Sequence, residues 1–335
     1  MTRRRYGDAR PRAGITAGLA LGVWLATAVT APSPLAATAR AGRPVMGTIL
    51  QVAVTADDGA AARRMAEMCI EIGARWDDVL TTWREDGELQ RLNASAGSGP
   101  FEASNDLLSA LEHMRAAAHT TGGAFEPGVG PVVMRLRRGQ PVDDALRHSL
   151  ADRGIEKTLE LTSETATLAT GAALDAGGIG KGIALDAMAE YLLGSGVQAA
   201  FLDFGGSSQL AVGKQPTGSE QWTLVLAGFE EGTILGTFTL EAGSLSTSRA
   251  SPAANPAGAI VDPRSGRAVE PPVLVTVHAD DATTAEYWST ALIVLGRNGL
   301  ERARAAGVEA VLEDANGIAT TPGFAIEDAR PAPTR

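Results

Sequence analysis

The sequence is poor in cysteine and histidine and has no excess of positive charge. Its single cysteine, Cys69, excludes disulfide scaffolds and thiolate zinc sites, and with only four histidines a histidine-based metal cluster is not expected. The formal net charge of −10 argues against nucleic acid as a partner. A local basic pocket within the acidic chain is still compatible with this balance.

Glycine, in contrast, is abundant, with 39 residues in a chain of 335. This abundance indicates that loops and tight turns are important. Hydrophobic residues make up 44% and charged residues 20%, as in a globular protein rather than a membrane bundle or a disordered chain. The length fits one or two domains with a substantial core.

A leader is predicted over residues 1–39. Arginines at positions 3–5 precede a moderately apolar run over residues 13–31, as in a signal peptide. Ala37-Thr38-Ala39 fits the small-residue cleavage pattern, so the mature protein is predicted to start near Arg40. The paired arginines also suit the twin-arginine route, and an uncleaved leader would act as an N-terminal anchor. We therefore expect export to the periplasm.

The rest of the chain mixes helical and strand patterns without an internal repeat or an obvious linker. It predicts a single α/β or α+β domain over residues 40–330, followed by a proline-rich, frayed tail over 331–335. Apolar spacing predicts helices over 60–80, 105–120 and 285–295, and strands around 49–54, 274–277 and 308–312, with further short strands between 165 and 245.

The strongest local signal is the segment from Leu174 to Asp186. An apolar strand is predicted to run into four glycines and then into a helix that reaches Leu193. Glycine N–H groups, the helix N-terminus and Lys181 together would favour a phosphate. The spacing matches neither a Walker loop nor a dinucleotide-binding turn. A plain tight turn between strand and helix is the alternative.

A second signal is Glu286 and Thr290, which lie four residues apart and therefore share one face of a helix. Their oxygens are suited to a hard cation such as Mg²⁺, which takes few carboxylates from a protein. The alternative is structural: Thr283 and Glu286 also form a capping-box pattern, and Thr290 can bond back within the helix.

Three turn-like segments follow the glycine-rich one, at 204–208, 246–249 and 261–266. Asp262 to Gly266 reads as a type I turn. The hydroxyls next to Arg249 are suited to a phosphate or the polar edge of a ring, although each segment can equally be only a turn. Trp83 is suited to stacking on a planar ligand or to packing in the core.

Read in order, these segments resemble the ApbE family, the FAD:protein FMN transferases, over residues 45–328. The resemblance lies in a series of matches in the family's order: Met46-Gly47-Thr48, Leu80 to Trp83, Gly87 to Asn93, Gly122 to Gly130, Leu174 to Asp186, Phe204-Gly205-Gly206, Ser246-Thr247-Ser248, Ile260 to Gly266 and Ala285 to Leu292. The resemblance implies an α+β fold, the family's single, T-fold-related domain of mixed sheets and flanking helices.

The resemblance implies a Mg²⁺-dependent transfer of FMN from FAD to a Thr or Ser of an acceptor flavoprotein, with release of AMP. It implies a metal site of Gly180, Glu286 and Thr290, and catalytic roles for Lys181, Thr290 and Asp262. The residues implied to line FAD are Met46, Trp83, Glu126, Asp175, Gly177, Gly178, Lys181, Asp186, Gly205, Gly206, Ser246, Thr247, Ser248 and Arg249. The implied acceptor is a membrane respiratory or electron-transfer subunit.

The sequence departs from the family pattern at several of these positions. Glu286 replaces the usual Asp, Ala259 replaces a His, and Arg249 replaces a Gly, while Trp83 and Glu126 replace Tyr and Asp. Three alternatives to the transferase therefore stay open: a periplasmic FAD-binding protein, a metal-dependent hydrolase that splits FAD into FMN and AMP, and a non-catalytic assembly partner.

Overall fold

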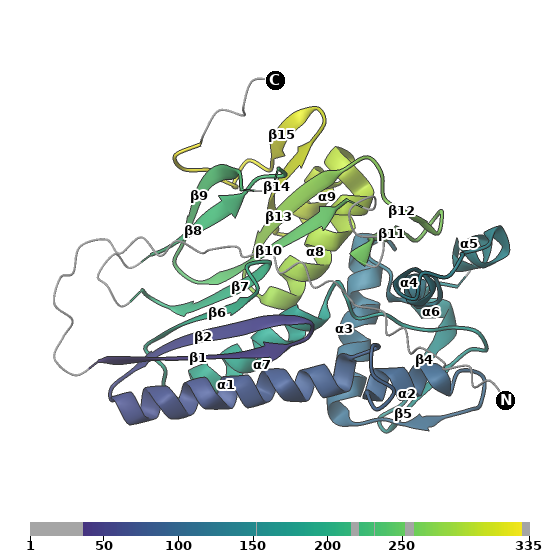
Figure 1. Ribbon diagram of the computed structural model, residues 1–335, viewed down its shortest axis with the longest axis horizontal. Coiled ribbons are helices and arrows are strands. Elements are labelled where there is room, and N and C mark those ends of the chain that lie inside the picture. The colour runs from purple at the N-terminus through teal and green to yellow at the C-terminus, as the bar shows by residue number, and fades with distance from the viewer. Residues whose placement is uncertain (1–35, 152, 216–220, 231, 252–257, 330–335) are drawn as a thin grey trace, which may run out of the picture.

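The centre of the fold is an eight-stranded sheet in which all neighbouring strands are antiparallel (Figure 1). The computed structural model describes residues 36–151, 153–215, 221–230, 232–251 and 258–329. In sheet order the strands are β1 (Ala37–Val45), β2 (Thr48–Ala56), β6 (Ala199–Phe204), β7 (Ser208–Gly213), β10 (Gly243–Ala250), β13 (Val273–Ala279), β14 (Glu309–Asp314) and β15 (Gly317–Thr320).

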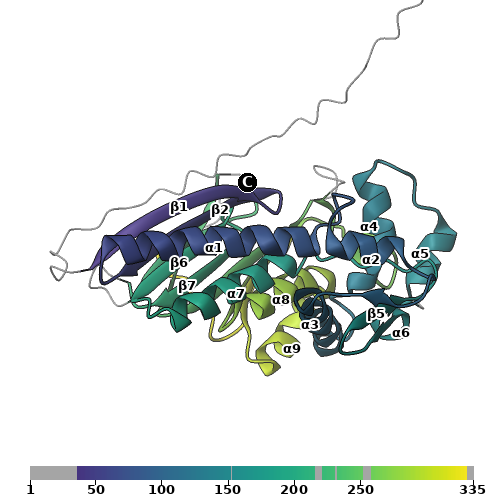
Figure 2. The ribbon, with the colours of Figure 1, turned by 90° about the horizontal axis from the view of Figure 1, so that it is seen from below.

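Both faces of this sheet are covered. Successive side chains of a strand point to opposite faces, and those of the central strands enter two different hydrophobic cores. In β6, Leu202 and Phe204 enter the main core, whereas Phe201 enters a second, smaller core. Three helices cover the main-core face: α1 (Gly59–Leu80), α7 (Gly180–Gly194) and α8 (Ala282–Leu295) (Figure 2). The β8–β9 ribbon (Trp222–Ala227, Ile234–Leu240) contributes Trp222 and Phe238 to the smaller core.

The long helix α1 follows from the spacing of its apolar residues. Asp58 caps its start by accepting hydrogen bonds from the backbone N–H groups of Ala60 and Ala61, both at 2.8 Å. Its buried residues recur every three or four positions and so form one stripe against the sheet: Ala62, Met65, Ala66, Cys69, Ile70, Gly73, Trp76, Val79 and Leu80. Burial raises the pKa of the Cys69 thiol to about 12, as expected for an inert core cysteine.

Smaller elements gather beyond one end of the sheet (Figures 1 and 2). They are the helices α2 (Glu88–Ala94), α3 (Asn105–Thr121), η1 (Pro127–Val129), α4 (Gly130–Arg137), α5 (Asp144–Ala151) and α6 (Ile155–Thr158), the three-stranded sheet β3 (Phe101–Glu102), β5 (Thr165–Leu168) and β4 (Leu159–Leu161), and the hairpin β11 (Val261–Asp262) and β12 (Arg267–Ala268). The chain also contains η3 (Gly296–Gly299) and α9 (Leu300–Ala305), which precede β14.

Several predicted elements are confirmed with small shifts of their bounds. The helices predicted over 60–80 and 105–120 are α1 and α3, and Gly122 ends α3 with a φ of 63°. The helix predicted from residue 285 begins at Ala282, one residue after its cap Asp281. The strands around 274–277 and 308–312 are β13 and β14.

The strand predicted before the glycines is wrong, because residues 169–179 form turns and loop. The Asn93 side chain accepts from the N–H of Leu174 at 2.8 Å and donates to its carbonyl at 2.9 Å. The Asn93 side chain thus satisfies the backbone N–H and carbonyl of the buried Leu174. In a strand, these groups would bond to a neighbouring strand instead.

Most of the predicted leader, and the whole predicted tail over 331–335, lie outside the described residues. The last residues of the predicted leader are described, however. Strand β1 begins at Ala37, and Ala37 and Ala39 pair with Ala56 and Val54 of β2. The described residues contain no helix that is long and apolar enough to cross a membrane. The predicted leader and its cleavage stay predictions.

Candidate functional site

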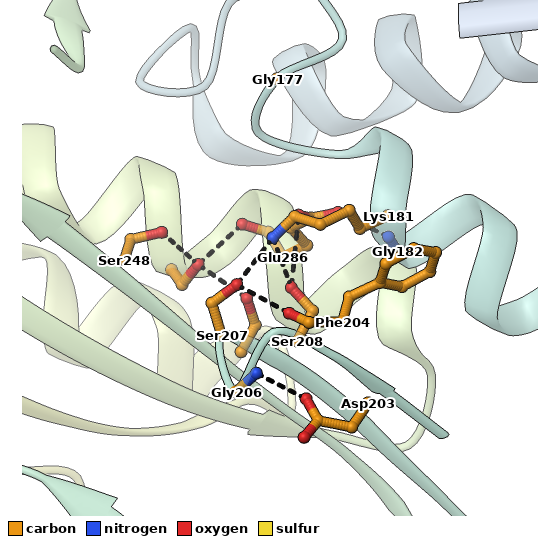
Figure 3. A network of polar contacts seen from close by, with 12 residues as sticks. Gly177, Lys181, Gly182, Asp203, Phe204, Gly206, Ser207, Ser208, Ser248 and Glu286 are labelled. Carbon is orange, nitrogen blue, oxygen red and sulfur yellow. Dashed lines mark hydrogen bonds and ion pairs between the residues drawn. The ribbon is translucent and has the colours of Figure 1, made fainter. Parts of the chain in front are cut away.

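A buried polar network forms where the N-terminus of α7 meets α8 and the turn between β6 and β7 (Figure 3). The ammonium of Lys181 lies 3.0 Å from Oε1 of Glu286, and it donates to the hydroxyls of Ser208 at 2.7 Å and Ser207 at 3.1 Å. The other carboxylate oxygen, Oε2, accepts from the N–H of Gly182 at 2.5 Å. Two signals that are separate in the sequence thus form one site.

Glu286 is only 2% exposed, so its charge must be matched inside the protein. The Lys181 ammonium, the Gly182 N–H and the Ser208 hydroxyl at 3.4 Å provide that match. The capping-box interpretation of Glu286 is wrong, because Asp281 caps α8 by accepting from the N–H of Thr284 at 2.7 Å. The Glu286 carboxylate is therefore directed into the site.

The glycine-rich segment packs directly against α8. A Cβ on Gly182 would lie 2.5 Å from the carbonyl oxygen of Ala282, and one on Gly178 would lie 2.7 Å from Oγ1 of Thr290. Only glycine therefore allows the segment and α8 to lie this close together at these two positions. The Thr290 hydroxyl is thereby placed against the loop that precedes Lys181.

Asp186, one turn further along α7, also reaches α8. Its carboxylate accepts from the backbone N–H groups of Ala282 at 2.7 Å and Thr283 at 2.9 Å, and from the Thr283 hydroxyl. Burial raises its pKa, although these hydrogen bonds oppose the shift. Asp186 joins the two helices that hold Lys181 and Glu286, and its contact with FAD stays a prediction.

The hydroxyls of β10 are divided between the two faces of the sheet. Ser246 and Ser248 both bond to the Ser289 hydroxyl of α8, at 3.1 and 2.7 Å. The hydroxyl of Thr247 bonds instead to that of Thr276, at 2.9 Å, on the opposite face. The sequence grouped these three residues, whereas the structure places only the two serines beside α8.

The Arg249 side chain reaches the loop between β8 and β9. Its guanidinium donates to the carbonyls of Gly228, at 3.0 Å, and Phe229, and lies 5.1 Å from the centroid of the Phe229 ring. The side chain therefore holds the loop of the β8–β9 ribbon. These contacts with backbone carbonyls do not form a phosphate clamp.

Two tight turns lie next to each other at one end of the sheet. Met46 and Gly47 connect β1 to β2 with φ values of 51° and 73°, and Gly205 and Gly206 begin the β6–β7 turn with φ values of 62° and 75°. A Cβ on Gly205 would lie 2.1 Å from Oγ1 of Thr48, so the turns touch. The predicted FAD residues in these turns thus lie together.

A pocket of about 270 Å³ opens on the other side of the glycine loop. Its lining includes several of the predicted residues that the polar network leaves out: Glu126, Asp175, Gly177, Gly178, Ser248, Arg249 and Thr290, together with Ala259. A second hollow, of about 420 Å³, lies between β1 and α1 and shares no residue with the polar network. The pocket beside the glycine loop is therefore the candidate ligand site.

Glu126 has a structural task at this pocket. Its Oε1 accepts from the N–H groups of Gly128 at 2.8 Å and Ile155 at 2.9 Å, which joins η1 to α6. Burial raises its pKa.

Asp262 lies outside the polar network. A turn is confirmed at this place, because the Asp262 carbonyl accepts from the N–H of Ser265 at 3.2 Å and from that of Gly266 at 2.8 Å. The carboxylate is paired with Arg264, whose Nε lies 2.9 Å away. Its neighbour Val261 lines the pocket, and the catalytic role of Asp262 stays a prediction.

Arg137 is the main residue that the sequence reasoning missed. Its Nη1 lies 2.7 Å from Oδ1 of Asp175, and its guanidinium carbon lies 4.6 Å from the centroid of the Trp83 ring. Trp83 itself is 69% exposed, which excludes the core position considered for it. No local pattern identifies Arg137, because its partners come from other segments of the chain.

The residues predicted to hold Mg²⁺ fit a hard cation in their chemistry. Glu286 supplies a buried carboxylate and Thr290 a hydroxyl one turn further along α8, beside the glycine loop. Among the described residues no three acidic, histidine or cysteine side chains gather at one point. A cation here would depend on this mixed oxygen set and on ligand oxygens.

The glycine loop, with a pocket on one side and the helix N-terminus and Lys181 on the other, defines a class: an α+β protein with an arrangement suited to a phosphorylated ligand. The model of the ApbE family matches residues 46–312, and the chain belongs to the ApbE family. The predicted family is thus confirmed.

Curated relatives and solved structures agree with this assignment. A FAD:protein FMN transferase of Rhodobacter capsulatus is 30% identical over 98% of this chain and 67% of its own length, and one of Klebsiella pneumoniae is 28% identical over 75% and 81%. The ApbE protein from Thermotoga maritima has a TM-score of 0.76 at 22% identity, covering 85% of this chain and 97% of its own. The flavin transferase ApbE from Vibrio cholerae has a TM-score of 0.73 at 24% identity and the same coverage. These structures confirm the predicted α+β fold.

Proposed function

We propose that this chain is a Mg²⁺-dependent FAD:protein FMN transferase that attaches FMN to a Ser or Thr of an acceptor flavoprotein. The observation that carries the proposal is the ion pair between Lys181 and the buried Glu286 at the N-terminus of α7, directly after the glycine loop. The names of the curated relatives support the same reaction.

The chemistry of this reaction explains why such a site is useful. The acceptor hydroxyl oxygen attacks the phosphorus of the FMN half of FAD, and the bond from that phosphorus to the bridging oxygen breaks. AMP leaves with the bridging oxygen, and the hydroxyl gives up its proton. Negative charge grows on the leaving phosphate, so fixed positive groups lower the barrier.

Lys181 and the start of α7 supply such groups from the chain itself. The first N–H groups of a helix carry partial positive charge and favour an anion. The ammonium of Lys181 is held by Glu286 and two serine hydroxyls, so its position is set before a ligand arrives. We propose that Lys181 binds a phosphate oxygen of FAD, with Gly177 and Gly178 leaving room for the pyrophosphate.

Glu286, Thr290 and the backbone of Gly180 would hold Mg²⁺ in this proposal. When bound, the ion neutralises charge on the pyrophosphate and makes AMP a better leaving group. Lys181 and Mg²⁺ would then both depend on the Glu286 carboxylate, which makes this residue the centre of the site.

The proposed acceptor is a flavoprotein subunit of a membrane respiratory or electron-transfer complex, met in the periplasm. The leader pattern in residues 1–39 supports export.

Product analysis tests the proposal and separates it from hydrolysis. The chain is incubated with FAD, Mg²⁺ and a candidate acceptor domain, and AMP and free FMN are measured by chromatography. A transferase releases AMP while FMN stays on the acceptor, and EDTA stops the release. Equal amounts of AMP and free FMN, without labelled acceptor, would instead identify a FAD hydrolase.

A further inference from the structure

Four residues from three segments form a second cluster on the pocket side of the glycine loop: Thr82, Trp83, Arg137 and Asp175, here called the arginine cluster. Nη1 of Arg137 lies 2.7 Å from Oδ1 of Asp175 and donates to the Thr82 hydroxyl at 2.9 Å. Oδ2 of Asp175 accepts from the N–H of Gly177 at 3.0 Å. Asp175 therefore connects the Arg137 guanidinium to the glycine loop.

The same guanidinium lies over the Trp83 indole, 4.6 Å from its centroid. The Arg137 side chain is 14% exposed, whereas Trp83 is 69% exposed. A planar guanidinium stacked on an indole gains a cation–π attraction and limits the rotamers of that ring. Arg137 thus fixes a tryptophan whose surface is mostly open to a ligand.

The arginine cluster borders the candidate ligand site. Two of its members, Arg137 and Asp175, line the 270 Å³ pocket, and Trp83 lies against Arg137. Nε of Arg137 is buried there and has no hydrogen-bond partner among the described residues. The charge of Arg137 is already matched by the Asp175 carboxylate, which is 10% exposed, so the cluster offers a phosphate little net charge. It offers a flat ring surface instead.

We propose that Arg137 is a positioning residue for flavin recognition. It holds the Trp83 indole in place to stack on the isoalloxazine ring of FAD, and through Asp175 it fixes that indole relative to the loop that binds the phosphates. The inference rests on the proposed function and assigns ring recognition to a residue outside the motifs of the sequence.

Binding of FAD and of ADP, which lacks the flavin ring, tests this inference. The variants are Arg137→Lys, which keeps a charge for Asp175 but loses the planar stack, Trp83→Ala, and the double variant. Arg138→Lys, at the exposed neighbour, is the matched control. FAD affinity is measured by flavin fluorescence and ADP affinity by calorimetry, with folding checked by urea unfolding.

Arg137→Lys is expected to weaken FAD binding roughly two- to fivefold, the worth of one cation–π contact, and to leave ADP binding unchanged. Saturated complexes of the variant should also show brighter flavin emission, because the indole quenches less. In the Trp83→Ala background the same substitution should have no further effect. Arg138→Lys should resemble the wild type throughout.

Equal losses for FAD and ADP, or additive effects of Arg137→Lys and Trp83→Ala, would overturn the inference. If Arg137→Lys does not fold, Thr82→Val replaces it, since it removes only the hydroxyl that accepts from the guanidinium; FAD affinity must fall and ADP affinity must not. A wild type that binds FAD but transfers no FMN would refute the proposed function and leave the inference standing.

Discussion

Replacing Glu286 by Gln tests the centre of the site, because it removes the charge and keeps the shape. The amide oxygen can still accept from the Gly182 N–H, but the Lys181 ammonium loses the carboxylate 3.0 Å away. Breaking a fully buried ion pair costs about 3–5 kcal/mol. The Lys181 side chain is 22% exposed, so water screens part of its charge and we expect about 1–3 kcal/mol here.

Activity should fall further than stability. Loss of the only carboxylate in the proposed metal site, together with a displaced lysine, should lower the transfer rate by at least about a hundredfold. Glu286→Asp keeps the charge and should retain Mg²⁺-dependent transfer. Glu301→Gln, at an exposed residue of α9, is the control and should change neither property.

Urea unfolding gives the free energy of the variant, and acceptor labelling gives its rate. Glu286→Gln with normal labelling and normal dependence on Mg²⁺ would refute the reasoning, since the carboxylate would then be neither a metal ligand nor the holder of Lys181. Unchanged stability with lost activity would show that the pair is screened more than its burial suggests.

Three further predictions concern the packing and proton balance around this site. Gly182→Ala should destabilise the fold by about 1–3 kcal/mol and impair transfer, because its Cβ would lie 2.5 Å from the Ala282 carbonyl oxygen. Gly194→Ala lies in open space at the end of the same helix and should stabilise the fold by roughly 0.5–1 kcal/mol. Urea unfolding of both variants separates the effect of the steric contact from that of helix propensity. Burial raises the pKa of Asp186 above its ordinary value of 3.8, so the stability linked to its proton is present below that pH and is lost as the pH rises through the folded-state value. The stability advantage of wild type over Asp186→Asn, measured from pH 3.8 towards neutrality, should therefore shrink with rising pH, and an advantage that grows would show the opposite shift. Ala259→His, at a residue that lines the pocket, should raise the transfer rate by supplying an imidazole within reach of the ligand, and a lower rate at unchanged stability would show that the pocket needs the small side chain.

Local pattern was enough to predict much of the fold. The stripe of apolar residues in α1 and the αL cap at Gly122 are properties of neighbouring residues, so spacing alone finds both helices. The strand expected before the glycines failed for a long-range reason. The Asn93 side chain forms hydrogen bonds with both the N–H and the carbonyl of Leu174, and the residues around Leu174 in the sequence do not identify this partner.

In the candidate site, too, local motifs were predictable from the sequence, whereas contacts between distant segments were not. Lys181 and Glu286 were each found from their own motif, but their contact is visible only in the folded chain. Period-two alternation separates Thr247 from Ser246 and Ser248, which motif matching alone overlooks. Arg137 escaped detection because a lone arginine becomes informative only when Asp175 and Trp83 surround it.

The most direct test of the central claim is the intact mass of an acceptor flavoprotein domain before and after incubation with this chain, FAD and Mg²⁺. We expect the acceptor to gain the mass of one FMN less one water, located on a Ser or Thr, and we expect no gain with EDTA or with the Glu286→Gln variant. An unchanged acceptor mass alongside free FMN would contradict FMN transfer and identify water as the nucleophile.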